Sequence, residues 1–233
     1  MTRYAIYFAP ECASPWWQSG CRWLGRDPET GICTAAAPIA DVPAALQSRL
    51  TSSARRYGFH ATLKAPFHLA NGFDEARLID MAHAFARHQR TITLHEPVVG
   101  TIGAFLALLP AVAQADISAL AMRCVSYFDL LRAPMSAEEM ARRQNSGLSA
   151  RQNALLSRWG YPFTEEAYRF HMTLSDALTD IDAVAVSALR AAAEACFAEA
   201  AGAPLLINAL AIFREPMPGY DFELIARVGF ASD

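Results

Sequence analysis

A seven-residue pattern that occurs twice constrains this chain more than any other feature. The first copy, residues 57–63, reads YGFHATL, and the second, residues 168–174, reads YRFHMTL, so the shared frame is Tyr-x-Phe-His-x-Thr-Leu. Both copies alternate apolar and polar residues, which is typical of a strand with one buried face. Side chains two positions apart in a strand share a face. We therefore predict two related strands, each with its apolar residues inside and a His and a Thr outside.

The segments that follow the two copies have a common plan of a helix and then strands. Beyond the motif strands, periodicity and turn residues predict strands over 3–9, 91–94, 98–109, 205–213 and 222–230, and helices over 74–88, 116–131, 149–159 and 182–200, with a further helix that begins at Ser136. Residues 55–69 are predicted as the first motif strand. Residues 10–53 show turn signals without a clear period, which predicts an irregular segment that is either functional or a cover over the core.

This order of elements predicts an α+β protein. Residues 1–233 show no linker of flexible composition. We therefore predict a single domain with two pseudo-symmetric lobes, one His-x-Thr strand in each. In this arrangement two antiparallel sheets face a central cleft, and the helices lie outside them.

Composition limits the partners and the compartment. The net charge of −3 and a pI near 6.1 argue against a footprint for long nucleic acid, although a short RNA end or a nucleotide remains possible. Five cysteines without CxxC spacing are typical of reduced thiols, which predicts a cytoplasmic protein. The longest apolar run, 102–113, is too short to span a bilayer, so no membrane partner is expected.

Two histidines on opposite walls of a cleft suit displacement at phosphorus. One neutral imidazole, His60 or His171, takes a proton from water, and the other donates one to the leaving alkoxide. Thr62 and Thr173 would donate hydrogen bonds to phosphate oxygens. Lys64, the single lysine of the chain, and Arg169 fall on the histidine face by parity and would add positive charge. The scheme needs no metal or cofactor.

The alternative interpretation is a strand duplicated for packing alone. Duplication for packing would preserve the apolar face, but it has no need of a His and a Thr on the other face. The pattern therefore favours a catalytic pair. Neither histidine can be assigned as base or acid at this point, because the two copies are nearly equivalent.

The tetrads HATL (60–63) and HMTL (171–174) resemble the signature motifs of the two-histidine (2H) phosphoesterase superfamily. The resemblance implies a bilobal α+β fold, His60 and His171 as the acid/base pair, and Thr62 and Thr173 as phosphate-binding residues. The segments RYAIYF (3–8), RWLGRD (22–27), YGFHATLKAPF (57–67) and WGYPF (159–163) are similar to one uncharacterised bacterial branch, DUF1045-like proteins, often encoded with phosphonate-utilisation genes.

Membership of that branch would imply a cyclic phosphodiester of a small ribose phosphate or nucleotide as substrate. Two alternatives remain, an RNA 2′,3′-cyclic phosphodiesterase and a non-catalytic protein that binds a phosphosugar. Further candidates for substrate contacts lie in or beside the shared segments: Arg26, Tyr57 and Tyr168, together with Lys64 and Arg169.

Overall fold

A seven-stranded antiparallel sheet forms the centre of the molecule. The computed structural model describes residues 1–36 and 38–231. The strand order is β4-β5-β6-β2-β1-β8-β9, with the bounds β1 Arg3–Phe8, β2 Ala61–Phe67, β4 Pro97–Ile102, β5 Phe105–Pro110, β6 Met172–Thr173, β8 Ala209–Glu215 and β9 Glu223–Gly229. A two-stranded sheet pairs β3 (Ile92–Leu94) with β7 (Leu205–Ile207). The predicted α+β class with antiparallel sheets is confirmed.

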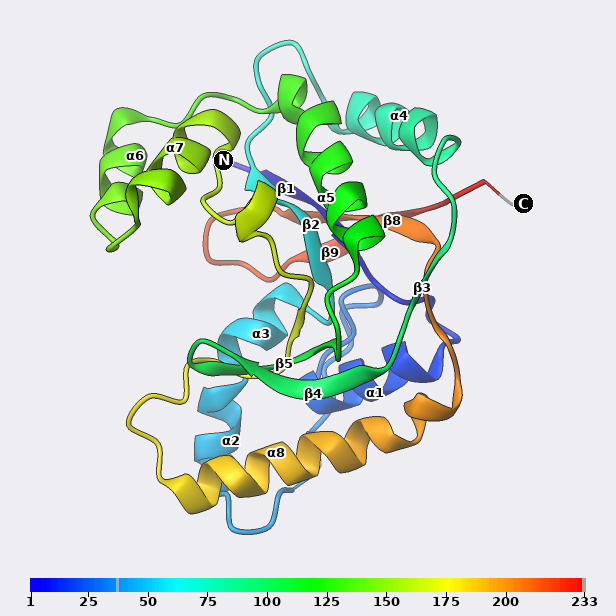
Figure 1. Cartoon of the computed structure of the whole chain (residues 1–233), viewed down its shortest axis with the longest axis vertical. Helices are drawn as coiled ribbons and strands as arrows, with labels where there is room; N and C mark the ends of the chain where they lie inside the picture. The colour runs from blue at the N-terminus through cyan, green and yellow to red at the C-terminus, as the bar shows by residue number, and fades with distance from the viewer. Residues whose placement is uncertain (37, 232–233) are drawn as a thin grey trace.

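The helices lie in two groups. Figure 1 shows one group below β4 and β5, formed by α1 (Pro15–Leu24), α2 (Ala44–Leu50) and α8 (Ala183–Ala198), with α3 (Ser52–Tyr57) beside the sheet. The other group lies near β1 and β2 and contains α4 (Glu75–Ala86), α5 (Ala115–Tyr127), α6 (Ala137–Gln144) and α7 (Ala150–Trp159). The helices predicted after Asp74, Ser136 and Ser149 are confirmed, because each of these side chains caps its helix.

The prediction that residues 10–53 are irregular is wrong in part. Helices α1 and α2 lie within this segment and α3 starts at its end, whereas the stretch between α1 and α2 is largely turns and coil where the structure describes it. Ser14 accepts a hydrogen bond from the backbone N–H of Trp16, and Gly25 ends α1 with φ 70°. These residues are an N-cap and a left-handed C-cap, and they resemble turn signals in the sequence. The predicted strand 205–213 is also divided, at Asn208, into β7 and β8 of different sheets.

The two motif strands are neighbours in one sheet. They were expected to lie in separate sheets on opposite walls of a cleft, but Ala61 of β2 pairs with Met172 of β6. The second copy forms only a two-residue strand, so β2 and β6 are joined by a single residue pair. Backbone pairing therefore brings the two copies together directly.

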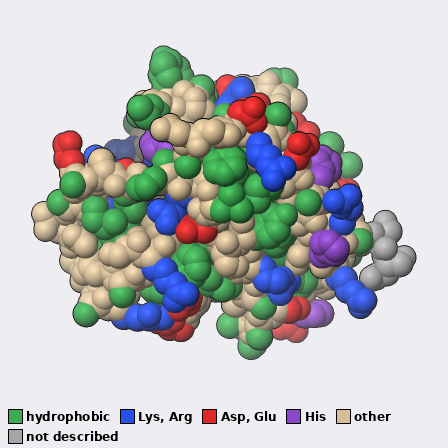
Figure 2. Space-filling model, turned by 90° about the horizontal axis from the view of Figure 1, so that it is seen from above, with side chains coloured by type: hydrophobic (Ala, Val, Ile, Leu, Met, Phe, Trp, Pro, Cys, Tyr) green, Lys and Arg blue, Asp and Glu red, His purple; other side chains and the backbone are tan. Residues whose placement is uncertain are grey.

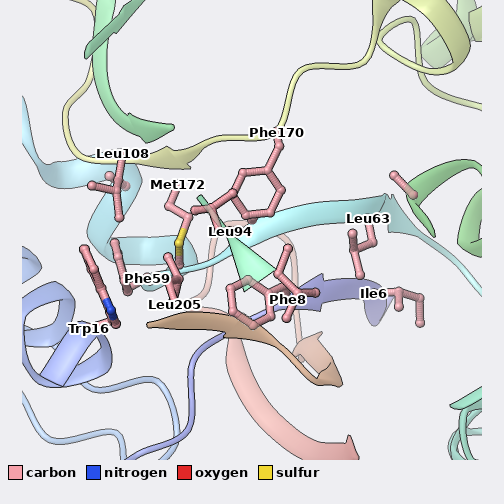
Figure 3. Close-up of a cluster of buried hydrophobic side chains, with 14 of the residues drawn as sticks. Ile6, Phe8, Trp16, Phe59, Leu63, Leu94, Leu108, Phe170, Met172 and Leu205 are labelled. Atoms are coloured by element: carbon pink, nitrogen blue, oxygen red, sulfur yellow. The ribbon is translucent and has the colours of Figure 1, made fainter. Parts of the chain in front are cut away.

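The apolar residues of both copies share one core, as their alternation predicts. Phe59, Phe170 and Met172 gather with Phe8 of β1 and Trp16 of α1 in Figure 3, and all five are buried. Burial of such a side chain contributes about 1.5–3 kcal/mol. His60, Thr62, His171 and Thr173, in contrast, retain partial exposure. The alternation thus assigns the inner and outer faces of both motifs correctly.

The surface carries charges of both signs. On the face shown in Figure 2, basic and acidic side chains are interspersed with apolar ones. Within residues 1–36 and 38–231, no helix combines the length and the apolar character that a membrane crossing requires.

Candidate functional site

Both histidines are held by the same backbone contact. Nδ1 of His60 lies 2.9 Å from the carbonyl oxygen of Gly58, and Nδ1 of His171 lies 2.8 Å from that of Arg169. In each case the carbonyl belongs to the residue two positions earlier in the motif. A carbonyl oxygen only accepts, so Nδ1 carries the proton and Nε2 is left for chemistry. The duplication therefore preserves the orientation of the imidazole as well as the residue type.

Gly58 connects the first histidine to the end of a helix. Its N–H caps α3 by donating to the carbonyls of Ala54 and Arg55, while its own carbonyl accepts from His60. The residue has φ +80°, and a Cβ at this position would lie 2.6 Å from the side chain of Pro28. Only glycine fits this conformation and this space. The first copy therefore needs Gly58 where the second copy has Arg169.

The two motifs meet in a pocket of about 260 Å³ that we call the histidine pocket. The predicted residues that line it are His60, Thr62, His171, Thr173 and Tyr57. Oγ1 of Thr62 lies 3.4 Å from Nε2 of His60, so the hydroxyl and the reactive nitrogen are adjacent. The structure thus brings five of the nine candidate residues to one place.

Burial favours the neutral form of both imidazoles. Desolvation lowers the pKa of His60 to about 4, and the nearby His171 lowers it further, against the hydrogen bond to Gly58. Burial also lowers the pKa of His171. The His60 ring stacks on the buried Tyr7 ring, with centroids 3.8 Å apart and an interplanar angle of 22°. An apolar ring face cannot replace the water that an imidazolium loses, which accounts for the direction of the shift.

A second, aromatic cavity adjoins the histidine pocket. This aromatic pocket has a volume of about 220 Å³ and shares Thr62, His171 and Tyr161 with the histidine pocket. Its remaining wall is mostly apolar and includes Phe67, Ile102, Phe105, Trp159, Phe163 and Tyr168, with the basic residues Lys64, Arg132 and Arg169 also lining it. A planar or apolar group could therefore pack beside the histidines.

Lys64 does not face the histidine pocket, in contrast to the parity prediction. Between β1 and β2 the register shifts, so that Tyr7 lies opposite Thr62 but Ile6 lies opposite Lys64. The extra residue in β2 reverses the alternation and moves Lys64 to the face of Ile6. There its side chain is 3% exposed, and Nζ donates to Asp129 Oδ1 at 3.0 Å and to a helix carbonyl. The lysine is thus a member of a buried ion pair.

We expect the substitution Lys64→Met to reduce stability and to leave the predicted phosphodiesterase activity largely intact. The change removes one partner of Asp129, which keeps its ion pair with Arg132, so the free energy of unfolding should fall by about 1–3 kcal/mol. Urea unfolding measures this loss, and the kcat/KM of the same variant should stay within about threefold of wild type. A loss of turnover without a loss of stability would instead support the prediction that Lys64 contacts phosphate.

Arg26 is also structural rather than substrate-binding. Its guanidinium donates to the backbone carbonyls of Arg55, Arg56 and Phe222 and pairs with Asp221, and the residue is 3% exposed. It ties the segment after α1 to the end of α3 and to the start of β9. Arg26 lines neither the histidine pocket nor the aromatic pocket, so its position gives the expected substrate contact no support.

The remaining two candidates lie beside the histidine pocket. The hydroxyl of Tyr168 donates to the carbonyl of Thr62 at 3.1 Å, so the second motif supports the first. Arg169 is exposed and borders the aromatic pocket, and its guanidinium donates to the carbonyls of Glu166 and Tyr168. Both residues contact the motif backbone, and both adjoin the space next to His171.

Sequence reasoning missed Tyr7, Tyr161 and Ser53, which also line the histidine pocket. Tyr161 lies in the segment WGYPF and Ser53 four positions before the first motif, so a search for hydroxyl groups beside the motifs would have found both. Tyr7 is far from either motif in the sequence, and only the pairing of β1 with β2 places it opposite Thr62. Across the described residues, no group of three or more His, Cys, Asp or Glu side chains is placed to hold a metal ion.

Comparisons with known proteins bear on the family. The family described as "Protein of unknown function (DUF1045)" matches residues 62–223. A curated relative from Janthinobacterium sp. (strain Marseille), named ribose 1,5-bisphosphate phosphokinase PhnN, is 53% identical over 99% of this chain and 51% of its own length. A relative of the same name from Laribacter hongkongensis is 38% identical over 95% of this chain and 50% of its own length. The chain spans about half the length of the curated relatives that it matches.

Two solved structures also align with this chain, at low sequence identity. The crystal structure of Escherichia coli LigT complexed with 3′-AMP aligns with a TM-score of 0.43 and 13% identity, over 99% of each chain. A crystal structure described as a phosphoesterase aligns with a TM-score of 0.40 and 13% identity, over 100% of each chain.

Proposed function

This chain belongs to the DUF1045 family, and we propose that it is a metal-independent phosphodiesterase acting on a cyclic phosphodiester of a small ribose phosphate or nucleotide. One observation carries the proposal. Two imidazoles with the same backbone support, His60 and His171, line one pocket together with Thr62 and Thr173. Two groups that can each hold or release a proton are what hydrolysis of a phosphodiester requires.

The reaction uses the two Nε2 atoms in opposite protonation states. A neutral imidazole takes a proton from water as the water oxygen forms a bond to phosphorus. The other histidine, as an imidazolium, gives its proton to the ester oxygen as the bond between that oxygen and phosphorus breaks. The threonine hydroxyls donate hydrogen bonds to the non-bridging oxygens, where charge shifts in the transition state. The product of ring opening is a phosphate monoester.

The names of the curated relatives support a ribose phosphate as the first substrate class to test. Those relatives are named as kinases of a ribose bisphosphate, but this chain spans only about half of their length. The sequence contains no GxxxxGK[ST] loop for binding the phosphates of ATP. The hydrolytic pocket thus accounts better for this chain than phosphoryl transfer from ATP does. A role in phosphonate metabolism follows from the resemblance to the branch encoded with phosphonate-utilisation genes.

The aromatic pocket favours a second candidate, an RNA end that carries a 2′,3′-cyclic phosphate. Aromatic side chains such as Trp159, Phe105 and Tyr168 stack with bases, and stacking contributes about 1–3 kcal/mol per base. The net charge of −3 argues against long RNA, so the candidate is limited to a short end or a single nucleotide. Cyclic ribose phosphates and a short cyclic-phosphate RNA should be compared in one competition assay.

A turnover screen of cyclic phosphodiesters in the presence of EDTA tests the proposal. We expect hydrolysis of at least one cyclic ribose phosphate or nucleoside cyclic phosphate, unchanged by the chelator, and no consumption of ATP with ribose bisphosphate. Tight binding without turnover across the panel would instead support a non-catalytic protein that binds phosphosugars. Activity that EDTA abolishes would contradict the metal-independent mechanism.

A further inference from the structure

The histidine pocket presents hydroxyl groups without side-chain charges of its own. Apart from the two histidines, six hydroxyl-bearing residues line it: Tyr7, Ser53, Tyr57, Thr62, Tyr161 and Thr173. None of the described residues that line this pocket is a Lys, Arg, Asp or Glu. When both imidazoles are neutral, a phosphate in the pocket can be held by neutral donors alone.

Two arginines behind the tyrosines of the pocket are bound to a buried carboxylate. Glu215 has a fully buried side chain, which accepts hydrogen bonds from both Arg3 and Arg56. The Arg56 guanidinium lies 4.8 Å from the centre of the Tyr57 ring, and both arginines act on the Tyr7 phenol. Arg3, Arg56 and Glu215 together carry a net charge of one positive unit, and this cluster lies behind Tyr7 and Tyr57.

The tyrosines of the pocket stay protonated and can donate. Burial raises the pKa of Tyr7 well above its usual value and raises that of Tyr161 to about 12. Tyr7, Tyr57 and Tyr161 line the same pocket, and the Tyr57 and Tyr161 phenols contribute to the raised pKa of Tyr7. A neutral phenol hydroxyl is a donor to a phosphate oxygen. Tyr7 therefore combines stacking on His60 with a polar group at the same pocket.

Substrate and product of the proposed reaction differ in charge. A phosphodiester carries one negative charge, whereas a monoester carries two at pH 8 because its second pKa is about 6. The single positive charge behind Tyr7 and Tyr57 matches the diester, and the additional charge of the monoester has no cation in the pocket. An unpaired charge that is withdrawn from water is unfavourable.

We propose that the histidine pocket selects a singly charged phosphodiester over a doubly charged phosphate monoester, with the Tyr7 hydroxyl among the groups that bind the phosphate. This inference rests on the proposed function, because it assumes that phosphate binds between the two motifs. It predicts easier release of the monoester when both imidazoles are neutral, because the pocket then has no charge of its own to balance the second negative charge of the product. The neutral hydroxyl groups thus bind a singly charged ester better than a doubly charged one.

Calorimetric titration of the wild-type protein with two simple esters at pH 8 tests the proposal. Methyl phenyl phosphate is a diester with one charge, and phenyl phosphate is the matching monoester with two. We expect the diester to bind at least about tenfold more tightly. Equal affinities, tighter binding of phenyl phosphate, or no binding of either ester would overturn the proposal.

Three variants locate the effect. Ser53→Arg places a cation in the pocket from an exposed position on α3, and it should tighten binding of phenyl phosphate about tenfold with a smaller change for the diester. Tyr7→Phe keeps the stacking and removes the hydroxyl, so binding of the diester should weaken about tenfold. Tyr4→Phe is the matched control on β1, because its hydroxyl donates to Glu75 away from the pocket, and binding should not change. Loss of binding in both Tyr variants would indicate a structural role for Tyr7.

The titration separates this inference from the proposed function. A preference for the diester in a protein that hydrolyses no cyclic phosphodiester would leave the charge selection in place and remove the hydrolytic function. Turnover of a cyclic phosphodiester with equal affinities for the two esters would support the hydrolytic function and remove the charge selection.

Discussion

Replacement of either His60 or His171 with Ala is expected to reduce kcat for a cyclic phosphodiester by about a hundredfold to ten-thousandfold, the usual range for loss of a proton-transfer group. Each variant removes one of the two proton transfers and leaves the threonine hydroxyls in place. Because the two steps belong to one displacement, the double variant should be little worse than the single ones. Steady-state kinetics on the best substrate of the screen measures the change in kcat.

His83 and His88 provide matched controls for these variants. Both side chains are exposed, His83 on α4 and His88 just after it, away from the histidine pocket. Their replacement with Ala should leave kcat within about twofold of wild type, as surface substitutions usually do. Circular dichroism and urea unfolding establish that the catalytic variants remain folded. A His171→Ala protein that is folded and fully active would refute the proposed mechanism.

The pH dependence of kcat/KM should be a bell with its maximum in the acidic range. The reaction needs one neutral and one protonated histidine, and burial lowers the pKa of His60 to about 4 and that of His171 below its usual value near 6.5. The rate should fall about tenfold per pH unit on either side of these two values. The same bell is expected whichever histidine is the base, because it reports the pair. A profile that is flat from pH 5 to pH 8 would contradict the pKa directions.

Acid unfolding must be separated from the acidic limb of this profile. His60 has a lower pKa in the folded protein than in the unfolded chain, so the unfolded chain binds more protons between about pH 4 and 6.5. The stability that the neutral His60 contributes is fully present above about pH 6.5 and is lost as the pH falls toward 4. The loss amounts to about 3 kcal/mol. Urea unfolding at several pH values should show it, and His60→Gln should reduce it.

Much of the candidate site could be predicted because the relevant information is local. Alternation within seven residues determines which side chains leave the core, and it placed His60, Thr62, His171 and Thr173 on the outer face. The repeat of the pattern then indicated that two such faces serve one purpose. The backbone contact to each Nδ1 follows from the short distance along the chain and is the same in both copies.

What the sequence did not predict depends on long-range contacts. The position of Lys64 is set by a bulge against β1, which no pattern within β2 records. Arg26 is buried by carbonyls that belong to α3 and to the start of β9, about 30 and 200 positions away. Helix α1 contains Gly20 and two adjacent tryptophans, which weaken a helical pattern, and its apolar face became recognisable only against Phe59 and Phe197.

The hydrogen bond from Tyr168 to the carbonyl of Thr62 makes each copy of the motif a structural component of the other. The pair between Ala61 and Met172 has the same effect through the backbone. A protein that arose by duplication could in principle be cut into two modules that work alone, but these contacts connect its halves at the point where the chemistry is placed. Substitutions in the second motif should therefore alter the geometry of the first. The two copies are expected to evolve together as one structural unit rather than as two independent modules.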